Sequence, residues 1–164
     1  MINFTEWLKN KTELKEAQMG QPQMGQPQMG GNTKPVRWTM PNIMKEREEL
    51  ARTAKALNIN QKQLMQAVRN GRLVALDNGT WAKMQNTQSR DIQQGKAGVQ
   101  AVMQMGKEND RDAGSIFQGF QTGGDMPASI VLMNKGTPYL VAGNTRLAAA
   151  KAMGIRPNIF IITM

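Results

Sequence analysis

The last third of the chain alternates apolar runs with turns. Two β-branched runs lie on either side of an Asn-Lys-Gly turn, a pattern typical of two strands joined by a hairpin. A repeat of Leu and Ala at helical spacing follows, and Gly154 can end that helix before a third apolar run. The pattern predicts strand, strand, helix and strand at residues 129–133, 139–142, 145–153 and 159–162.

The middle of the chain carries helical patterns that turn residues interrupt. Asn42 can cap a first helix, whose early turns are acidic and whose Leu and Ala positions recur at helical spacing. A second helix is predicted at residues 61–69, with Asn70 and Gly71 as a left-handed stop.

A short strand at residues 73–76 is predicted to follow the second helix. The sequence Asp77-Asn78-Gly79 is typical of a tight turn, and Trp81 then anchors either a return strand or the start of a helix. Farther along, a helix is predicted around Val99 and Val102. A second short helix is predicted to carry Ile116, Phe117 and Phe120 and to end at the Gly123-Gly124 pair.

The amino-terminal residues have a different character. Residues 1–18 place apolar and aromatic side chains on one stripe of a short helix, which favours docking onto a partner surface, with a frayed terminus as the alternative. Residues 19–35 contain a five-residue repeat of Gln, Met, Gly and Pro, typical of a flexible tether. We therefore expect a chain of the α+β class divided into residues 1–18, 19–35, 36–92 and 93–164.

Composition narrows the chemistry. The sequence contains neither cysteine nor histidine, which excludes disulfides, thiolate nucleophiles, imidazole bases and the usual zinc ligand sets; neither zinc nor haem is expected. No apolar run approaches the roughly 20 residues that span a bilayer, and no signal-peptide pattern is present, so no membrane partner is expected.

Charge adds a preference for anionic partners. The net charge of +9 is uneven, with +1 over residues 1–35, +5 over residues 36–92 and +3 over residues 93–164. Two helices followed by a hairpin is the order of a winged helix-turn-helix module, and Lys62, Arg69 and Arg72 would then lie on or beside its second helix. These three cations are candidate nucleic-acid ligands, with a solvated helical face as the alternative.

The turn between the second strand and the helix of the carboxy-terminal segment is the main candidate site. Gly143 lets the backbone approach a ligand closely, and the first free amides of the following helix point outward with the positive end of its dipole. Arg146 adds a bidentate cation. Asn144 and Thr145 can either cap the helix or donate to the same anion.

The string GNTRLAAAKAMG between two strands resembles the G-x-x-R box of the ParB/sulfiredoxin superfamily. The resemblance covers about residues 112–164 and is nearest to ParB-like proteins of tailed bacteriophages. It implies a ParB/sulfiredoxin-like domain in which Gly143 and Arg146 bind a nucleotide phosphate and Asn144 and Thr145 line the site. A nucleoside triphosphate with Mg²⁺ is the cofactor that it implies.

The sequence departs from that superfamily in two ways that concern catalysis. The redox cysteine of sulfiredoxins is absent, which excludes sulfinic acid reduction, and the sequence shows no counterpart of an upstream ParB box. A nuclease or phosphotransferase would need a carboxylate near the turn. The catalytic residues are therefore left unassigned. The candidate carboxylates, for which a loop or helix-cap role is the favoured interpretation, are Glu108, Asp110, Asp112 and Asp125.

The amino terminus carries a second resemblance. Its first eight residues, followed by Leu14-Lys15-Glu16 before Ala17, resemble the capsid-targeting leaders of proteins packaged in tailed-phage heads, which a prohead protease removes. The resemblance implies a capsid or scaffold partner for the amino-terminal helix. Either the host cytoplasm or the phage virion is then the expected location.

Together these patterns predict a phage-type accessory protein that binds a nucleotide or DNA phosphate. Two alternatives stay open: a virion-packaged interaction protein without catalytic activity, and a ParB-like nuclease or nucleotide-dependent phosphotransferase.

Overall fold

The computed structural model describes residues 35–164. The predicted docking helix at residues 1–18 and the tether up to residue 34 lie outside the described residues. The described chain belongs to the α+β class, as expected, and its elements in chain order are β1 (Arg37–Thr39), α2 (Arg47–Ala56), α3 (Gln61–Arg69), β2 (Arg72–Ala75), α4 (Asn78–Lys83), the 3₁₀ turn η1 (Ser89–Asp91), α5 (Lys96–Glu108), α6 (Ala113–Thr122), β3 (Asp125–Pro127), β4 (Ser129–Asn134), β5 (Thr137–Ala142), α7 (Asn144–Ala152) and β6 (Asn158–Thr163).

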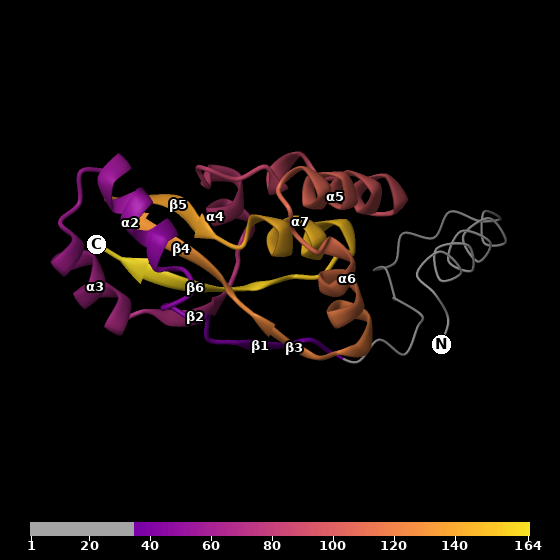
Figure 1. Ribbon diagram of the computed structural model, residues 1–164, viewed down its shortest axis with the longest axis horizontal. Coiled ribbons are helices and arrows are strands. Elements are labelled where there is room, and N and C mark those ends of the chain that lie inside the picture. Colours follow the sequence, from indigo (N-terminus) through magenta and orange to yellow (C-terminus); the bar gives the residue numbers. More distant parts are fainter. Residues whose placement is uncertain (1–34) are drawn as a thin grey trace, which may run out of the picture.

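A four-stranded mixed sheet forms the centre of the molecule, with strand order β2-β6-β4-β5. Its two inner strands, β4 and β6, are parallel, and each edge strand is antiparallel to its neighbour. A separate parallel pair joins β1 to β3, and these strands run side by side along the lower edge of Figure 1. Because β3 leads directly into β4, this pair ties the start of the described chain to the sheet.

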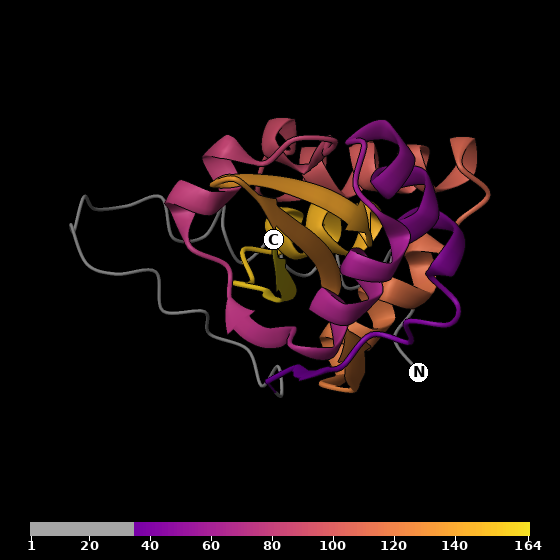
Figure 2. The same ribbon diagram turned by 90° about the vertical axis from the view of Figure 1, so that its left-hand side faces the viewer.

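Helices cover both faces of the sheet. The alternation along β4 shows this arrangement, since Ile130 and Leu132 pack with α2 and α3 while Val131 packs with Leu147 of α7 on the other face. In Figure 2 the indigo and magenta helices α2 and α3 lie to the right of the orange strands. The segment at residues 36–92 is therefore part of the same core as the strands that follow it.

Helix α7 is buried on nearly every side. It packs on the sheet through Leu147 and against α5 and α6 through a run of alanines. The close approach of α5 requires Gly98, because a Cβ there would lie 1.6 Å from the Gln93 carbonyl oxygen and 3.2 Å from the Ala152 Cβ. Small side chains on both helices therefore allow α5 to pack closely against the last turn of α7.

The strand-strand-helix-strand order predicted for the last third is confirmed by β4, β5, α7 and β6. The helices predicted at 61–69, around Val99 and Val102, and around Phe117 and Phe120 are α3, α5 and α6. Gly123 ends α6 in the left-handed conformation, as expected of a glycine stop.

The return strand considered after residues 73–76 is not formed. Residues 78–83 form α4 instead, because the Asp77 carboxylate accepts hydrogen bonds from the backbone amide and hydroxyl of Thr80, at 2.8 and 2.6 Å, and so caps a helix. Strand β2 pairs with β6, whose residues lie more than eighty positions away in the sequence. The wing of a winged helix-turn-helix module is therefore missing from this segment.

The end of α3 and the start of α2 are formed by contacts that differ from those expected. Asn70 and Gly71 do not form a left-handed stop, since Asn70 has φ −96° and Gly71 is not among the glycines with positive φ. Position 71 requires glycine because a Cβ there would lie 2.2 Å from the Phe160 ring, which packs against the backbone. Asn42 caps the turn before α2, accepting from the amides of Met44 and Lys45 at 3.1 and 3.2 Å.

Candidate nucleotide-binding cleft

A cleft of about 860 Å³ opens at the junction of β5 and α7. The end of β5 and the first turn of α7 form its floor, and its walls come from the start of α2, the loop before η1 and the loop between α5 and α6. Its lining residues are Glu46, Glu49, Asn86, Thr87, Gln88, Asn109, Arg111, Asp112, Ile116, Leu140, Val141, Ala142, Gly143, Asn144, Thr145 and Arg146. The structure thus brings all four residues of the predicted turn into one cleft.

Gly143 has a structural reason to be glycine. Its φ of +94° lies in the left-handed region, and a Cβ would lie 2.3 Å from the Ser129 Oγ. The buried Ser129 hydroxyl donates to the Gly143 carbonyl oxygen at 2.9 Å. Packing against β4 therefore accounts for this glycine without any ligand.

The first turn of α7, which lines the cleft, carries backbone amides without a hydrogen-bond partner in the described part of the chain. The first backbone bond of the helix runs from the Leu147 amide to the Gly143 carbonyl, so the amides of Asn144, Thr145 and Arg146 have no acceptor in the preceding turn. The Thr145 hydroxyl also makes no hydrogen bond with the described part of the chain. Helix amides at this end carry partial positive charge and favour anions.

Asn144 neither caps α7 nor points an unused group at the cleft. Its Oδ1 accepts from the Thr87 hydroxyl at 2.9 Å and from the Gln88 amide at 3.1 Å. Its Nδ2 donates to the Met105 sulfur at 3.7 Å. Asn144 therefore fastens one wall of the cleft to the helix, a positioning role outside the two that the sequence suggested.

Arg146 is held in place from two directions. Its guanidinium donates to the Pro127 carbonyl oxygen at 3.0 Å and lies 3.6 Å from the Glu46 carboxylate. Its side chain is only 15% exposed, and this burial lowers the pKa of Arg146, whereas Glu46 raises it and the nearby charge of Arg111 lowers it. An arginine stays protonated at neutral pH despite such a shift, so the cleft contains a fixed, partly desolvated cation.

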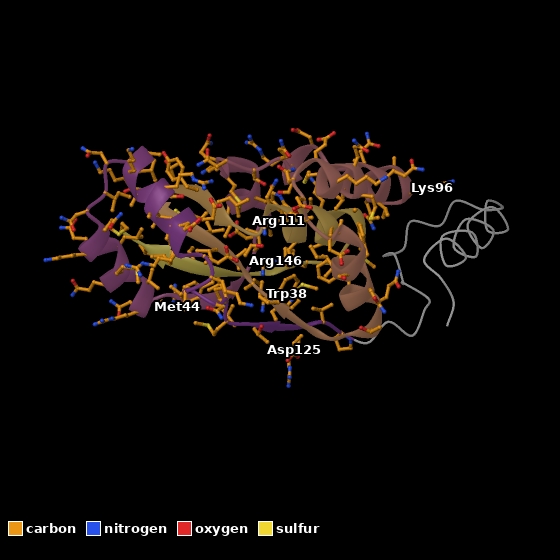
Figure 3. All side chains as sticks on the ribbon, viewed as in Figure 1. Trp38, Met44, Lys96, Arg111, Asp125 and Arg146 are labelled. Atoms are coloured by element: carbon orange, nitrogen blue, oxygen red, sulfur yellow. The ribbon has the colours of Figure 1, made fainter. Side chains whose placement is uncertain are left out.

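The structure adds three charged residues that the sequence did not single out. Arg111, from the loop between α5 and α6, lines the cleft near Arg146, and Figure 3 shows the two side chains at the centre of the molecule. Among the described residues its guanidinium has no hydrogen-bond or ion-pair partner. Glu46, just before α2, and Glu49, in its first turn, bring carboxylates that lie about a hundred positions away from the Gly143 turn in the sequence. No local motif reveals this contact.

The carboxylates proposed from the sequence are engaged elsewhere or lie in loops. Asp112 lines the cleft but caps α6, and the hydrogen bond from Ser115 lowers its pKa. Asp125 pairs with Arg37 at 2.5 Å, and the hydrogen bond from that arginine lowers its pKa. Glu108 accepts from Gln104 at 2.9 Å, while Asp110 lies in a loop with φ +50°. Residues 35–164 contain no group of three or more acidic side chains placed to hold a metal ion.

The other predicted nucleic-acid ligands lie apart from this cleft. Lys62 and Arg69 are exposed on α3, and Arg72 is exposed on β2. None of the three lines the cleft. Their role stays a prediction.

Comparison with known proteins gives no match to a family model, a curated protein or a solved structure. Within residues 35–164, no helix is both long and apolar enough to cross a membrane.

Proposed function

We propose that the protein is a phage-type accessory protein whose ParB-like domain binds a phosphate of a nucleotide or of DNA at residues 143–146. The observation that carries the proposal is that three helix amides and the Arg111 guanidinium, none of which has a partner among residues 35–164, belong to residues that line one cleft. Backbone amides at a helix start and a bidentate cation are the donors that phosphate oxygens prefer.

The size of the cleft favours a nucleotide over an isolated phosphate ion. A volume of about 860 Å³ lies in the range of about 300–1,000 Å³ that small-molecule sites occupy. Its lining also supplies acceptor oxygens, since the Glu49 carboxylate, beside its pairing with Arg52, can receive hydrogen bonds from sugar hydroxyls or a base amino group. The cleft thus combines donors for a phosphate with acceptors for the remainder of a nucleotide.

Binding without catalysis is the version that the contacts favour. The three carboxylates that line the cleft each have a partner: Glu46 lies beside Arg146, Glu49 pairs with Arg52 at 3.1 Å, and Asp112 caps α6. A general base or a metal ligand would have to leave its partner first. A Mg²⁺ ion carried by a triphosphate remains compatible with this cleft, and the enzyme alternative predicts that Mg²⁺ is required for turnover.

The test is thermal stabilisation by nucleoside triphosphates and short duplex DNA, with and without Mg²⁺. A ligand at about 100 times its Kd should stabilise the protein by about 2.7 kcal/mol. Arg111→Gln should weaken binding of the stabilising ligand about tenfold, because one charge-assisted contact is lost. Lys96→Gln removes the same charge at the far end of α5 and should leave affinity unchanged (Figure 3).

The contact between Glu46 and Arg146 gives a second test with the opposite sign. An anion must compete with the Glu46 carboxylate for Arg146, so Glu46→Gln should strengthen ligand binding by about fivefold. Glu48→Gln, on the same helix but outside the cleft, is the matched control. No stabilisation by any ligand would instead support the alternative of an interaction protein without a ligand.

The virion location is tested separately by mass spectrometry of purified phage particles. A packaged protein with a cleaved leader should begin at Ala17. An intact Met1 terminus inside the particles would contradict the leader hypothesis while leaving the cleft unaffected.

A further inference from the structure

A second cleft, of about 940 Å³, lies at the opposite end of α7 from the first. Its walls come from the end of β2, α4, the segment after η1, and the turn between α7 and β6. It shares no lining residue with the first cleft. Its lining residues are Leu76, Asp77, Asn78, Gly79, Trp81, Ala82, Arg90, Gln94, Lys151, Gly154, Ile155 and Arg156.

Three cations from separate segments converge on this cleft, and each is held by a backbone carbonyl. Arg90 donates to the Ala82 oxygen at 3.1 Å, Arg156 donates to the Leu76 oxygen at 3.2 Å, and Lys151 donates to the Arg90 oxygen. Neutral carbonyls fix these side chains without cancelling their charge. None of the three belongs to an ion pair within residues 35–164, so most of their donors remain free.

The cleft has little negative charge to offset them. Asp77 is the single carboxylate in its lining, and it is committed to capping α4 through Thr80. The hydrogen bonds from Thr80 occupy both of its oxygens and lower the pKa of Asp77. An approaching anion therefore meets a net positive wall whose side chains are already ordered.

An aromatic ring completes this wall. Trp81 is half-buried, its indole Nε1 donates to the Ser89 hydroxyl at 3.0 Å, and the Lys151 ammonium lies 5.5 Å from the ring centroid. The ring is thus fixed beside a cation. A fixed aromatic next to basic side chains is the arrangement that binds an unpaired base together with its phosphate.

We propose that this second cleft binds single-stranded nucleic acid, with Arg90, Lys151 and Arg156 contacting phosphodiester groups and Trp81 contacting a base. A duplex is disfavoured because its bases are stacked and paired, and so cannot reach Trp81. The proposal does not depend on the first cleft, and it assigns nucleic-acid contact to a different surface from Lys62, Arg69 and Arg72.

The experiment measures fluorescence anisotropy of a labelled 12-nucleotide oligothymidine over a series of NaCl concentrations, using the full chain in an Arg111→Gln background. Arg90→Gln combined with Arg156→Gln should weaken binding at least tenfold and reduce the salt slope by about 1.4, since each phosphate contact contributes about 0.7. Lys62→Gln combined with Arg69→Gln removes the same charge from α3 and should change affinity less than about twofold. Equal losses from the two double variants would overturn the proposal.

Two further variants separate stacking from charge. Trp81→Leu should weaken binding about tenfold with an unchanged salt slope, because stacking does not release counterions. Gln94→Lys adds a cation to the lining and should strengthen binding while raising the slope by about 0.7, a gain that no folding defect can imitate. Unchanged affinity in both variants, tighter binding of duplex DNA, or equal competition by a polyglutamate peptide would each contradict a single-strand site.

Discussion

Gly143 satisfies two separate requirements at one position. Its backbone adopts φ +94°, and the space where a side chain would begin is filled by Ser129. The first requirement concerns the turn into α7, and the second concerns the contact between β4 and that turn. The two can be measured apart because another glycine of the same domain meets only the first.

Gly136 provides that comparison, since its φ is +82° and nothing lies within 4 Å of a Cβ built there. Gly136→Ala should cost about 1–2 kcal/mol for the left-handed backbone alone. Gly143→Ala should cost clearly more, because Ser129 must also move. Urea denaturation of the two variants measures the difference, and equal losses would show that the Ser129 contact is unimportant.

At this scale the sequence predicted the position of the turn but not the tasks of its residues. Gly143, Arg146 and the helix start are local features, and all were expected where they occur. Asn144 was expected to cap the helix or meet an anion, yet its partners Thr87 and Gln88 lie more than fifty positions away. Such a contact depends on tertiary packing, for which the local pattern carries no signal.

Among the elements, α7 connects the wall of the first cleft to the core. Asn144 in its first turn holds the loop that precedes η1, and Lys151 in its last turn holds the Arg90 carbonyl just after the start of η1. Both ends of one buried helix thus position the same surface segment. A change at either end should loosen that segment before it unfolds the domain.

Asn144→Ala tests this connection. Removing the two hydrogen bonds that Asn144 accepts should speed amide hydrogen exchange at Gln88 and Ser89 and lower stability by about 1 kcal/mol. Asn109→Ala is the matched control, because Asn109 lines the same cleft but bonds only to Met105 in its own helix. Equal exchange at Gln88 in both variants would count against the connection.

The partner strand of β2 could not be predicted from the sequence pattern. A strand was expected at residues 73–76, one residue later than the observed β2, and the Asp77-Asn78-Gly79 sequence suggested a hairpin partner nearby. The capping of α4 by Asp77 directs the chain away, and β6 becomes the partner. The Asp-Asn-Gly motif is compatible with both a tight turn and a helix cap. It therefore does not indicate which distant strand pairs with β2.

The whole molecule depends on pH through carboxylates that donors stabilise in the folded state. Hydrogen bonds from Thr80, Ser115 and Arg37 lower the pKa values of Asp77, Asp112 and Asp125, in that order. A lowered pKa in the folded state contributes stability above the unfolded value of about 3.9 and loses it as pH falls through the folded value. Stability should therefore decline from about pH 5 downward.

Asp125→Asn tests the contribution of the ion pair between Asp125 and Arg37, which connects β3 to β1. The variant should melt at a lower temperature than the parent at pH 7, and the two melting temperatures should converge as pH falls through the lowered pKa of Asp125 in the folded state. Asp91→Asn removes an exposed carboxylate that makes no ion pair among the described residues and should melt like the parent throughout. A constant difference for Asp125→Asn at all pH values would contradict the assignment.

Strand β6 lies inside the sheet although it follows every other described strand in the chain. During synthesis, β2 and β4 are both made before β6, the strand that must separate them, so each has one edge without its native neighbour until β6 is complete. Those edges can pair with other nascent chains in the interval. Productive folding therefore awaits residues 158–163, and early termination should release an aggregating fragment instead of a smaller working domain.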